Sequence, residues 1–168
     1  MKFTGKHLVF TLLTFVALFS LLLFRSNDVR TIKDQLIRAE QSVNKLPNAK
    51  PLEQITIIQE LSTLLADDIE VELNSLDTSE LLKLSREEAR EKALAITKIS
   101  FAKLRTHIKN LRVTADSPQA EANFELSVIG AIQGTEGDFL ERGQIKIALS
   151  NSSGQWLVKK VKWDRLQP

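Results

Sequence analysis

The sequence predicts an α+β fold, in which an N-terminal transmembrane helix and a stalk helix precede a curved antiparallel sheet of four to five strands packed on two to three helices. Three observations support this prediction. Residues 8–24 form an uninterrupted apolar run. Over residues 28–99, apolar positions recur mainly every three or four residues, the period of amphipathic helices. From residue 104 onward the period is two, which is typical of half-buried strands.

The apolar run reads LVFTLLTFVALFSLLLF and contains no charge, glycine or proline. As a helix it rises about 25 Å, close to the roughly 30 Å hydrocarbon core of a bilayer. A cleaved signal peptide has a shorter apolar core and small residues before its cleavage site. Residues 25–28, RSND, do not provide such a site. We therefore expect a tail at residues 1–7 and an uncleaved signal anchor at 8–24, with a cleaved peptide or a buried soluble helix as the alternatives.

The orientation of the anchor is less strongly encoded. Lys2 and Lys6 precede the run, whereas Arg25, Arg30 and Lys33 are among the basic residues that follow it. Because the positive-inside rule counts Lys and Arg on each side, it comes close to balance here. A short tail followed by an apolar run resembles a secretory targeting signal. We therefore expect a cytoplasmic N-terminus, which in a bacterium places the anchor in the inner membrane and the domain in the periplasm.

Charge and composition restrict the partners of the domain. Of the 23 Lys and Arg residues, Lys2 and Lys6 precede the apolar run, and the remaining 21 balance the 21 Asp and Glu residues. A nucleic-acid-binding domain carries excess positive charge, so no nucleic acid is expected as a partner. Residues 103–112 are locally basic, and we interpret them as a solvated strand face rather than a site for an acidic partner or lipid headgroups. The chain contains no cysteine, which excludes disulfides and lipidation on cysteine.

Residues 25–46 are predicted to form the stalk helix. Its apolar positions alternate between spacings of three and four, and they are Val29, Ile32, Leu36, Ala39, Val43 and Leu46. This stripe either pairs two chains as a short coiled coil or packs on its own domain. It spans under three heptads, so pairing would need the support of the membrane helix. Pro47 and Pro51 predict a hinge at 47–51, because proline cannot continue a helix.

The remaining residues, 52–168, are predicted to form one domain. A helix is expected from Pro51 to Ala66, and its predicted apolar stripe comprises Leu52, Ile55, Ile58, Leu61 and Leu65. Residues 69–74 alternate between apolar and polar types and predict a short strand. Residues 77–84 are expected to form a helical turn. Ser85 and Glu88 have the spacing of a capping box, which predicts a helix from 85 to 99.

Four further strands are expected in sequence. They fall at 104–115, 120–128, 145–149 and 156–163, with a bulge near Asn110, a turn at 116–118, a long loop from 130 to 142 and a hairpin turn at 151–154. Val158 and Val161 have opposite parity, and one extra residue at Lys159-Lys160 reconciles them as a β-bulge. Because helices come first and strands last, an antiparallel α+β sheet is favoured, with the helices covering its apolar face.

Three segments resemble the nuclear transport factor 2-like superfamily, whose cystatin-like domains form a cone from a curved sheet and helices. They are SREEAREKAL (85–94), LRTHIKNLRVTADSPQAEANFELSVIG (104–130) and ERGQIKIALSNSSGQWLVKKVKW (141–163). The resemblance covers about residues 51–163. Within the superfamily, the chain is similar to small membrane-anchored bacterial members without an assigned activity. Members of the superfamily include isomerases, dehydratases, transport adaptors and membrane-anchored assembly subunits, among them an inner-membrane component of type IV secretion machines. The resemblance therefore implies a fold and a range of functions.

Enzymes of this superfamily often hold an Asp/His pair, or a Tyr with an acid, inside the cone. This chain has no Tyr and two His, of which only His107 belongs to the domain. His107 lies between Arg105 and Lys109 in strand parity, which predicts a solvated position. Neither metal-ligand spacing nor a nucleotide-binding motif occurs. We therefore expect no catalysis, no metal and no cofactor.

Three residues are candidates for contacts in a loop or pocket, namely His107, Glu141 and Arg142. The last two fall in the longest predicted loop, where Arg142 could bind a carboxylate. Taken together, the sequence predicts a single-pass envelope protein whose domain is a protein-binding or assembly module, through a partner or self-association. The alternatives are a tethered enzyme or small-ligand binder that uses the cone interior, and an accessory subunit of a secretion complex.

Overall fold

The computed structural model describes residues 27–75, 78–97, 101–132 and 137–166. The predicted tail and signal anchor at residues 1–24 lie outside these ranges. Within the described ranges, no helix is long and apolar enough to cross a membrane. The elements are a helix over 27–45, the 3-10 turn η1 (Leu46–Asn48), α2 (Pro51–Ser62), β1 (Leu65–Asn74), β2 (Ser79–Ser85), α3 (Arg86–Thr97), β3 (Phe101–Asp116), β4 (Gln119–Ile132), β5 (Phe139–Ser152) and β6 (Gln155–Arg165).

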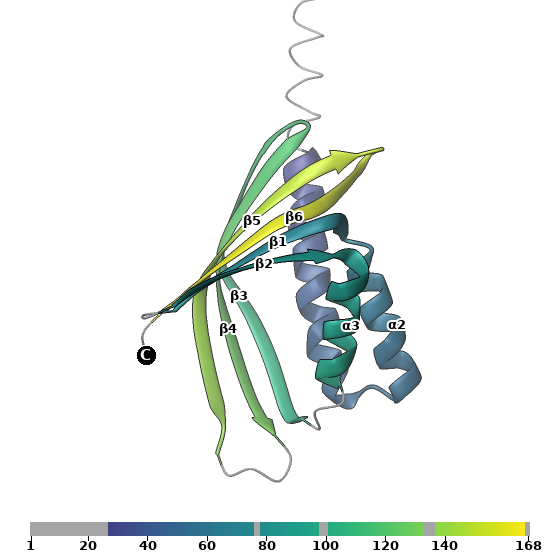
Figure 1. Ribbon diagram of the computed structural model, residues 1–168, viewed down its shortest axis with the longest axis vertical. Helices are drawn as coiled ribbons and strands as arrows, with labels where there is room; N and C mark the ends of the chain where they lie inside the picture. The colour runs from purple at the N-terminus through teal and green to yellow at the C-terminus, as the bar shows by residue number, and fades with distance from the viewer. Residues whose placement is uncertain (1–26, 76–77, 98–100, 133–136, 167–168) are drawn as a thin grey trace, which may run out of the picture.

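The strands form one curved, mixed sheet of six strands in the order β2-β1-β6-β5-β4-β3. The helix over 27–45, α2 and α3 lie together on one side of it (Figure 1). The α+β class is confirmed, but the prediction of four to five antiparallel strands was wrong in two respects. Residues 79–85 form β2 instead of a helical turn, because they pair with β1. In addition, β1 runs parallel to β6, a pairing that no local pattern indicates.

Both predicted bulges are present. The register between β3 and β4 shifts between Lys109 and Arg112, and Asn110 adopts a positive φ of 55°. In the β5–β6 pair, Ala148 faces Lys160 and Leu149 faces Val158, so Lys159 is the extra residue on β6. Each bulge was predicted from a change in parity along one strand, which is a local signal.

The helix boundaries follow local chemistry only in part. The capping box is confirmed, because Ser85 N donates to Glu88 Oε2 at 2.7 Å and Glu88 N donates to Ser85 Oγ at 3.2 Å. In contrast, α2 ends at Ser62 and β1 begins at Leu65, before the predicted boundary at Ala66. The α2 stripe was also partly wrong, since Leu52 is 77% exposed while Ile57 is buried beside Ile58. Helical periodicity alone does not decide which of two adjacent apolar faces is covered.

The helix over 27–45 packs on the inner face of its own sheet. Ile32 is fully buried in the core cluster, and Val29 and Leu36 pack against the same cluster. The indole of Trp156, also buried there, donates from Nε1 to Asp28 Oδ1 at 3.2 Å. This packing corresponds to the second interpretation of the stripe, in which it covers its own domain.

The core cluster is apolar. Its buried members are Ile32, Ala115, Ala120, Ala122, Phe124, Ile145, Ile147, Leu149, Trp156 and Val158. Among the described residues, no polar or charged residue belongs to the buried class. Alanines at three of the sheet positions leave space for the helix to approach the strands, because a methyl group projects little from the sheet.

The same helix covers part of the outer edge of β3. Asn44 Nδ2 donates to the carbonyl oxygen of Thr106 at 3.0 Å, and Thr106 N donates to Asn44 Oδ1 at 2.6 Å. One turn earlier, Glu40 Oε1 accepts from Ile108 N at 3.0 Å. An edge strand presents unpaired backbone donors and acceptors that need partners. The Asn44 amide therefore takes the place that a neighbouring strand would occupy.

Replacing Asn44 with alanine is expected to destabilise the domain. The change leaves the half-buried Thr106 N–H and carbonyl without their partner, which costs about 1–3 kcal/mol in the free energy of unfolding. Alanine is also the better helix former, so the measured loss is a lower bound. Urea unfolding of the full-length protein in mild detergent, followed by tryptophan fluorescence, measures it. The exposed Gln41→Ala variant is the control, and equal stabilities of the two variants would contradict the edge-covering role.

Replacing Ile32 with alanine is expected to cost about 2–4 kcal/mol, because it removes three carbon atoms from a closely packed site. The matched control is Ile37→Ala on the same helix, where the side chain is 41% exposed and the loss is expected to stay below about 1 kcal/mol. The same unfolding experiment compares them. If Ile32→Ala left stability unchanged but abolished crosslinking between chains, the stripe would serve chain pairing instead.

Candidate functional site

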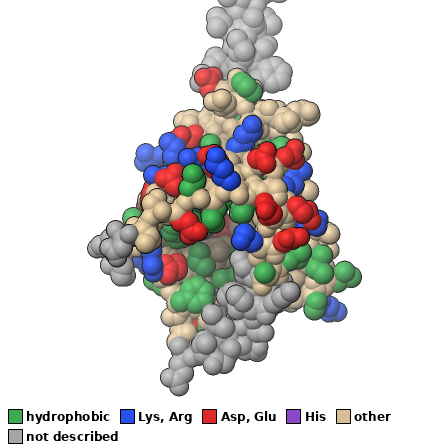
Figure 2. Space-filling view, viewed as in Figure 1, with side chains coloured by type: hydrophobic (Ala, Val, Ile, Leu, Met, Phe, Trp, Pro, Cys, Tyr) green, Lys and Arg blue, Asp and Glu red, His purple; other side chains and the backbone are tan. Residues whose placement is uncertain are grey.

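An open cavity of about 470 Å³ lies where the inner face of the sheet meets the β1–β2 hairpin. We call it the mouth cavity, and it is lined by Leu73, Asn74, Ser75, Thr78, Glu80, Val128, Glu141, Trp163 and Arg165. Figure 2 shows one face of the molecule, on which hydrophobic side chains border a hollow. The hairpin approaches the cavity through a turn in which Ser75 N donates to the carbonyl oxygen of Thr78 at 2.8 Å.

The walls of the mouth cavity are apolar. Leu73 lies opposite Trp163 in the β1–β6 register, and Trp163 lies opposite the buried Ile145. The indole lies over Gly143, where an added Cβ would sit 2.6 Å from the ring, so glycine is needed for this approach. Leu73 is 38% exposed and Val128 is half-buried. The apolar inner face of the sheet therefore continues past the core and ends in solvent.

One rim of the cavity carries an ion pair. Arg165 Nη2 donates to Glu141 Oε1 at 2.7 Å, and both side chains are about half exposed. A pair in this environment contributes little to stability, because water screens it. The ion pair instead holds the side chains of Glu141 and Arg165 beside the apolar walls of the cavity.

The structure separates the three predicted site residues. Glu141 lines the mouth cavity, whereas Arg142 is exposed and belongs to the opposite face, because neighbouring strand residues point in opposite directions. The predicted loop was too long, since β5 begins at Phe139 and includes both residues. His107 is a solvated residue on β3 with a side chain 65% exposed, and its Nδ1 lies 3.3 Å from Glu40 Oε1.

Sequence reasoning did not identify the apolar walls as part of a site. The alternating pattern predicted that Leu73 and Trp163 are inward-facing strand residues, but not that they line a cavity. No sequence pattern indicated a role for Arg165. Whether an inward-facing residue is covered depends on the length of neighbouring elements, which periodicity does not contain. Among the described residues, no cluster of three or more His, Asp or Glu side chains is placed to hold a metal ion.

The outer face of the sheet carries paired charges. Lys160 and Lys162 reach Glu72 at 3.3 and 3.2 Å, and Asn74 donates to the same carboxylate at 3.2 Å. The hydrogen bond from Asn74, followed by those from the two lysines, lowers the pKa of Glu72 to about 2. Glu121 is similarly held by Lys146 at 2.7 Å, which lowers its pKa. These carboxylates are therefore ionised at neutral pH.

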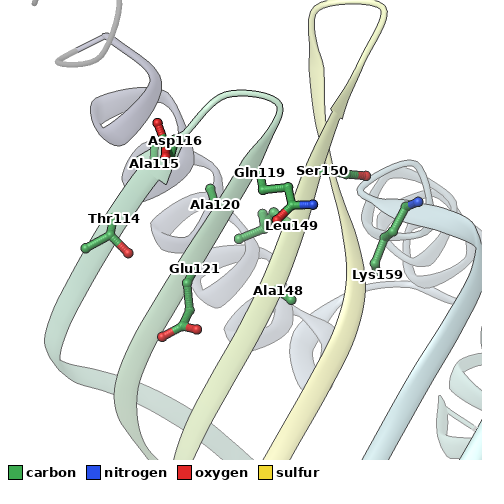
Figure 3. A pocket seen from close by; sticks show the side chains of 10 residues that line it. All are labelled: Thr114, Ala115, Asp116, Gln119, Ala120, Glu121, Ala148, Leu149, Ser150 and Lys159. Atoms are coloured by element: carbon green, nitrogen blue, oxygen red, sulfur yellow. The ribbon is translucent and has the colours of Figure 1, made fainter.

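A second cavity, which we call the outer depression, lies on this face across β3, β4 and β5 (Figure 3). Its volume is about 450 Å³. It is lined by Thr114, Ala115, Asp116, Gln119, Ala120, Glu121, Ala148, Leu149, Ser150 and Lys159. Unlike the mouth cavity, it is bordered by charged side chains of both signs.

No protein-family model matches this chain, and a search of curated proteins found no match. Solved structures do match it. A candidate scytalone dehydratase from Novosphingobium aromaticivorans has a TM-score of 0.66 at 16% identity, covering 83% of this chain and 85% of its own. A nuclear transport factor 2-like protein of unknown function from Pseudomonas putida has a TM-score of 0.63 at 15% identity, covering 83% and 87%.

An enzyme is also among the similar structures. A type 2 hexachlorocyclohexane dehydrochlorinase has a TM-score of 0.62 at 12% identity and covers 86% of this chain and 89% of its own. At such identities the likeness extends to the fold alone, because one fold hosts many activities. The described residues therefore have the fold of the nuclear transport factor 2-like proteins.

Proposed function

We propose that this protein is a single-pass membrane protein of the cell envelope whose domain is a non-catalytic binding module. The domain takes an apolar segment of a protein partner into the mouth cavity. The observation that carries this proposal is the exposure of apolar walls at the cavity, next to a core that is already filled.

The filled core argues against chemistry inside the cone. Phe124 and Trp156 are buried there, and the described residues contribute no polar or charged residue of the buried class. General acid–base catalysis needs a titratable group within hydrogen-bond reach of a substrate in a water-excluding site. His107, the domain's one histidine, is on the exposed edge strand instead.

The mouth cavity suits an apolar side chain from a partner. Leu73, Val128 and Trp163 provide a concave apolar surface, and the Glu141–Arg165 pair provides a polar rim. Protein interfaces have this arrangement, in which an anchor residue fills an apolar pocket and polar groups surround it. Tryptophan is among the residues that contribute most to binding at such sites.

The membrane part of the proposal rests on residues 8–24. Their length and composition suit one crossing of a bilayer. The helix is described from residue 27 onward, and it is bonded to the sheet through Asp28 and Asn44. An anchor at 8–24 would therefore tether the domain through a helix that is held on the domain's own sheet.

The second candidate is a small-ligand binder or a tethered enzyme that uses the same cavity. Its volume lies in the range of small-molecule sites, which supports this candidate. The carboxylates that line it belong to Glu80 and Glu141, and the latter is engaged by Arg165. An enzyme would need one of these groups to act as acid or base on a bound substrate.

Replacing Leu73 with aspartate is expected to abolish partner binding, because it places a charge on the apolar wall. The matched control is Leu81→Asp in the same hairpin, where the leucine is 55% exposed and faces away from the cavity, opposite Glu72. Affinity purification of tagged full-length protein from gently solubilised native membranes, read by mass spectrometry, measures the partner. A stoichiometric partner retained by Leu81→Asp and lost by Leu73→Asp would support the proposal.

Two results would contradict it. Equal retention of the partner by both variants would exclude the mouth cavity as its binding site. No stoichiometric partner, together with a small molecule that co-purifies with the wild type and is lost in Leu73→Asp, would favour the ligand-binding candidate. If the purified partner belongs to a secretion system, the protein is an accessory subunit of that system.

A further inference from the structure

We propose that the outer depression binds a zwitterionic phospholipid headgroup that carries a phosphate and a primary ammonium, as in phosphatidylethanolamine. The proposal rests on the anchoring part of the proposed function, and it adds a second site on the opposite face from the mouth cavity. Four observations lead to it, namely the shape of the depression, a lysine without a partner, the acidic groups opposite that lysine, and the end of the molecule at which the depression lies.

Short side chains create the depression. Thr114 faces Glu121, which faces Ala148, and one step further Asp116 faces Gln119, which faces Ser150. Residues directly opposite on paired strands point to the same face of a sheet. Ala148 and Ser150 on β5 therefore leave room beside the longer side chains of β4, as Figure 3 shows. The volume of about 450 Å³ accommodates a headgroup-sized molecule.

Lys159 supplies a positive charge that the protein does not use. The β-bulge places it between Val158, which faces the core, and Lys160, which binds acids on the outer face. The other lysines of the β5–β6 hairpin, Lys146, Lys160 and Lys162, each form an ion pair. Within the described residues no acidic side chain pairs with Lys159. A free ammonium at the margin of a polar depression suits a phosphate.

The remaining lining groups favour a positive charge. Asp116 and Glu121 bring carboxylates, and Gln119 brings an amide oxygen that can accept a hydrogen bond. Glu121 is ionised, because its hydrogen bond from Lys146 keeps its pKa low. Glu121 already accepts from Lys146 at 2.7 Å and from Asn123 at 2.8 Å, so it offers a ligand the remaining lone pairs of its carboxylate rather than an unpaired charge. N–H donors of a ligand suit these oxygens, and a phosphate suits Lys159. A ligand with both charges matches both sides.

The depression lies at the end of the molecule where the described helix begins. Figure 1 shows the β3–β4 and β5–β6 turns at that end. Asn151 N donates to the carbonyl oxygen of Pro118 at 2.8 Å, which joins the two turns, and Trp156 binds Asp28. Asp28 follows the last residue of the apolar run by four positions, which span at most about 14 Å. An anchor at 8–24 therefore brings the bilayer surface close to both turns.

The polarity of this end agrees with a contact to headgroups rather than to hydrocarbon. The exposed large apolar residues of the described chain lie elsewhere, and none belongs to residues 112–119 or 150–160. The turns carry Ser117, Asn151, Ser152 and Gln155 instead. Such hydroxyl and amide groups remain hydrated, so the surface rests against headgroups without insertion.

Native mass spectrometry of the full-length protein tests the proposal. Phosphatidylethanolamine, phosphatidylglycerol and phosphatidylcholine are titrated separately into the detergent-solubilised protein. Phosphatidylethanolamine is expected to bind most tightly, because it alone combines the phosphate with N–H donors for the carboxylates. Lys159→Gln is expected to weaken its binding roughly five- to tenfold, the effect of losing one charge-assisted hydrogen bond. Lys160→Gln removes the same charge one residue away and is expected to change binding less than about twofold.

Two further measurements test whether lipid binding depends on the shape of the outer depression and on the complete headgroup. Ala148→Leu fills the depression without changing charge and is expected to weaken binding as much as Lys159→Gln does. Glycerophosphoethanolamine, the headgroup without acyl chains, should compete, and inorganic phosphate alone should not. Equal effects of the two lysine variants, phosphatidylglycerol binding as tight as phosphatidylethanolamine, or competition by inorganic phosphate would overturn the headgroup proposal. Alkaline extraction of native membranes tests the anchor by itself, because release of the wild-type protein would overturn the anchoring on which the proposal rests.

Discussion

The docking of the helix over 27–45 onto the sheet is the interaction on which the rest of the structure depends. Ile32 is fully buried in the core cluster, Asp28 accepts a hydrogen bond from the indole N–H of the buried Trp156, and Asn44 pairs with the edge of β3. Each contact satisfies a need that the sheet alone leaves open, namely cover for an apolar face, a partner for a buried donor and protection for an exposed edge. Residues 27–45 thereby cover a sheet that is built from residues 65–165.

This docking also determines where binding can take place. Because the helix and the bulky Phe124 and Trp156 fill the inner face, the interior of the cone does not offer a polar chamber within the described residues. The apolar inner face nevertheless extends beyond the helix to Leu73 and Trp163, where it meets solvent. This arrangement is the physical basis of the proposal that the domain recognises an apolar segment of a partner.

The two faces of the sheet have different physical roles. The inner face gains stability from burial, whereas the outer face carries carboxylates held by lysines, such as Glu72 between Lys160 and Lys162. The bulge at Lys159 disturbs this regular pairing and leaves one charge unused beside a depression. Bulges often re-aim side chains in this manner, and here the re-aimed residue borders the outer depression.

By itself, the sequence determined the features that depend on neighbouring residues: the strand periods after residue 104, both bulges, the hairpin turns and the capping box at Ser85 and Glu88. These depend on local dihedral preferences and side-chain parity, which are written in consecutive residues. Only the tertiary structure decided that residues 79–85 form a strand, that β1 runs parallel to β6, and that Glu141 rather than Arg142 reaches the cavity. Those outcomes depend on partners distant in the chain, because backbone pairing and burial are properties of the assembled sheet.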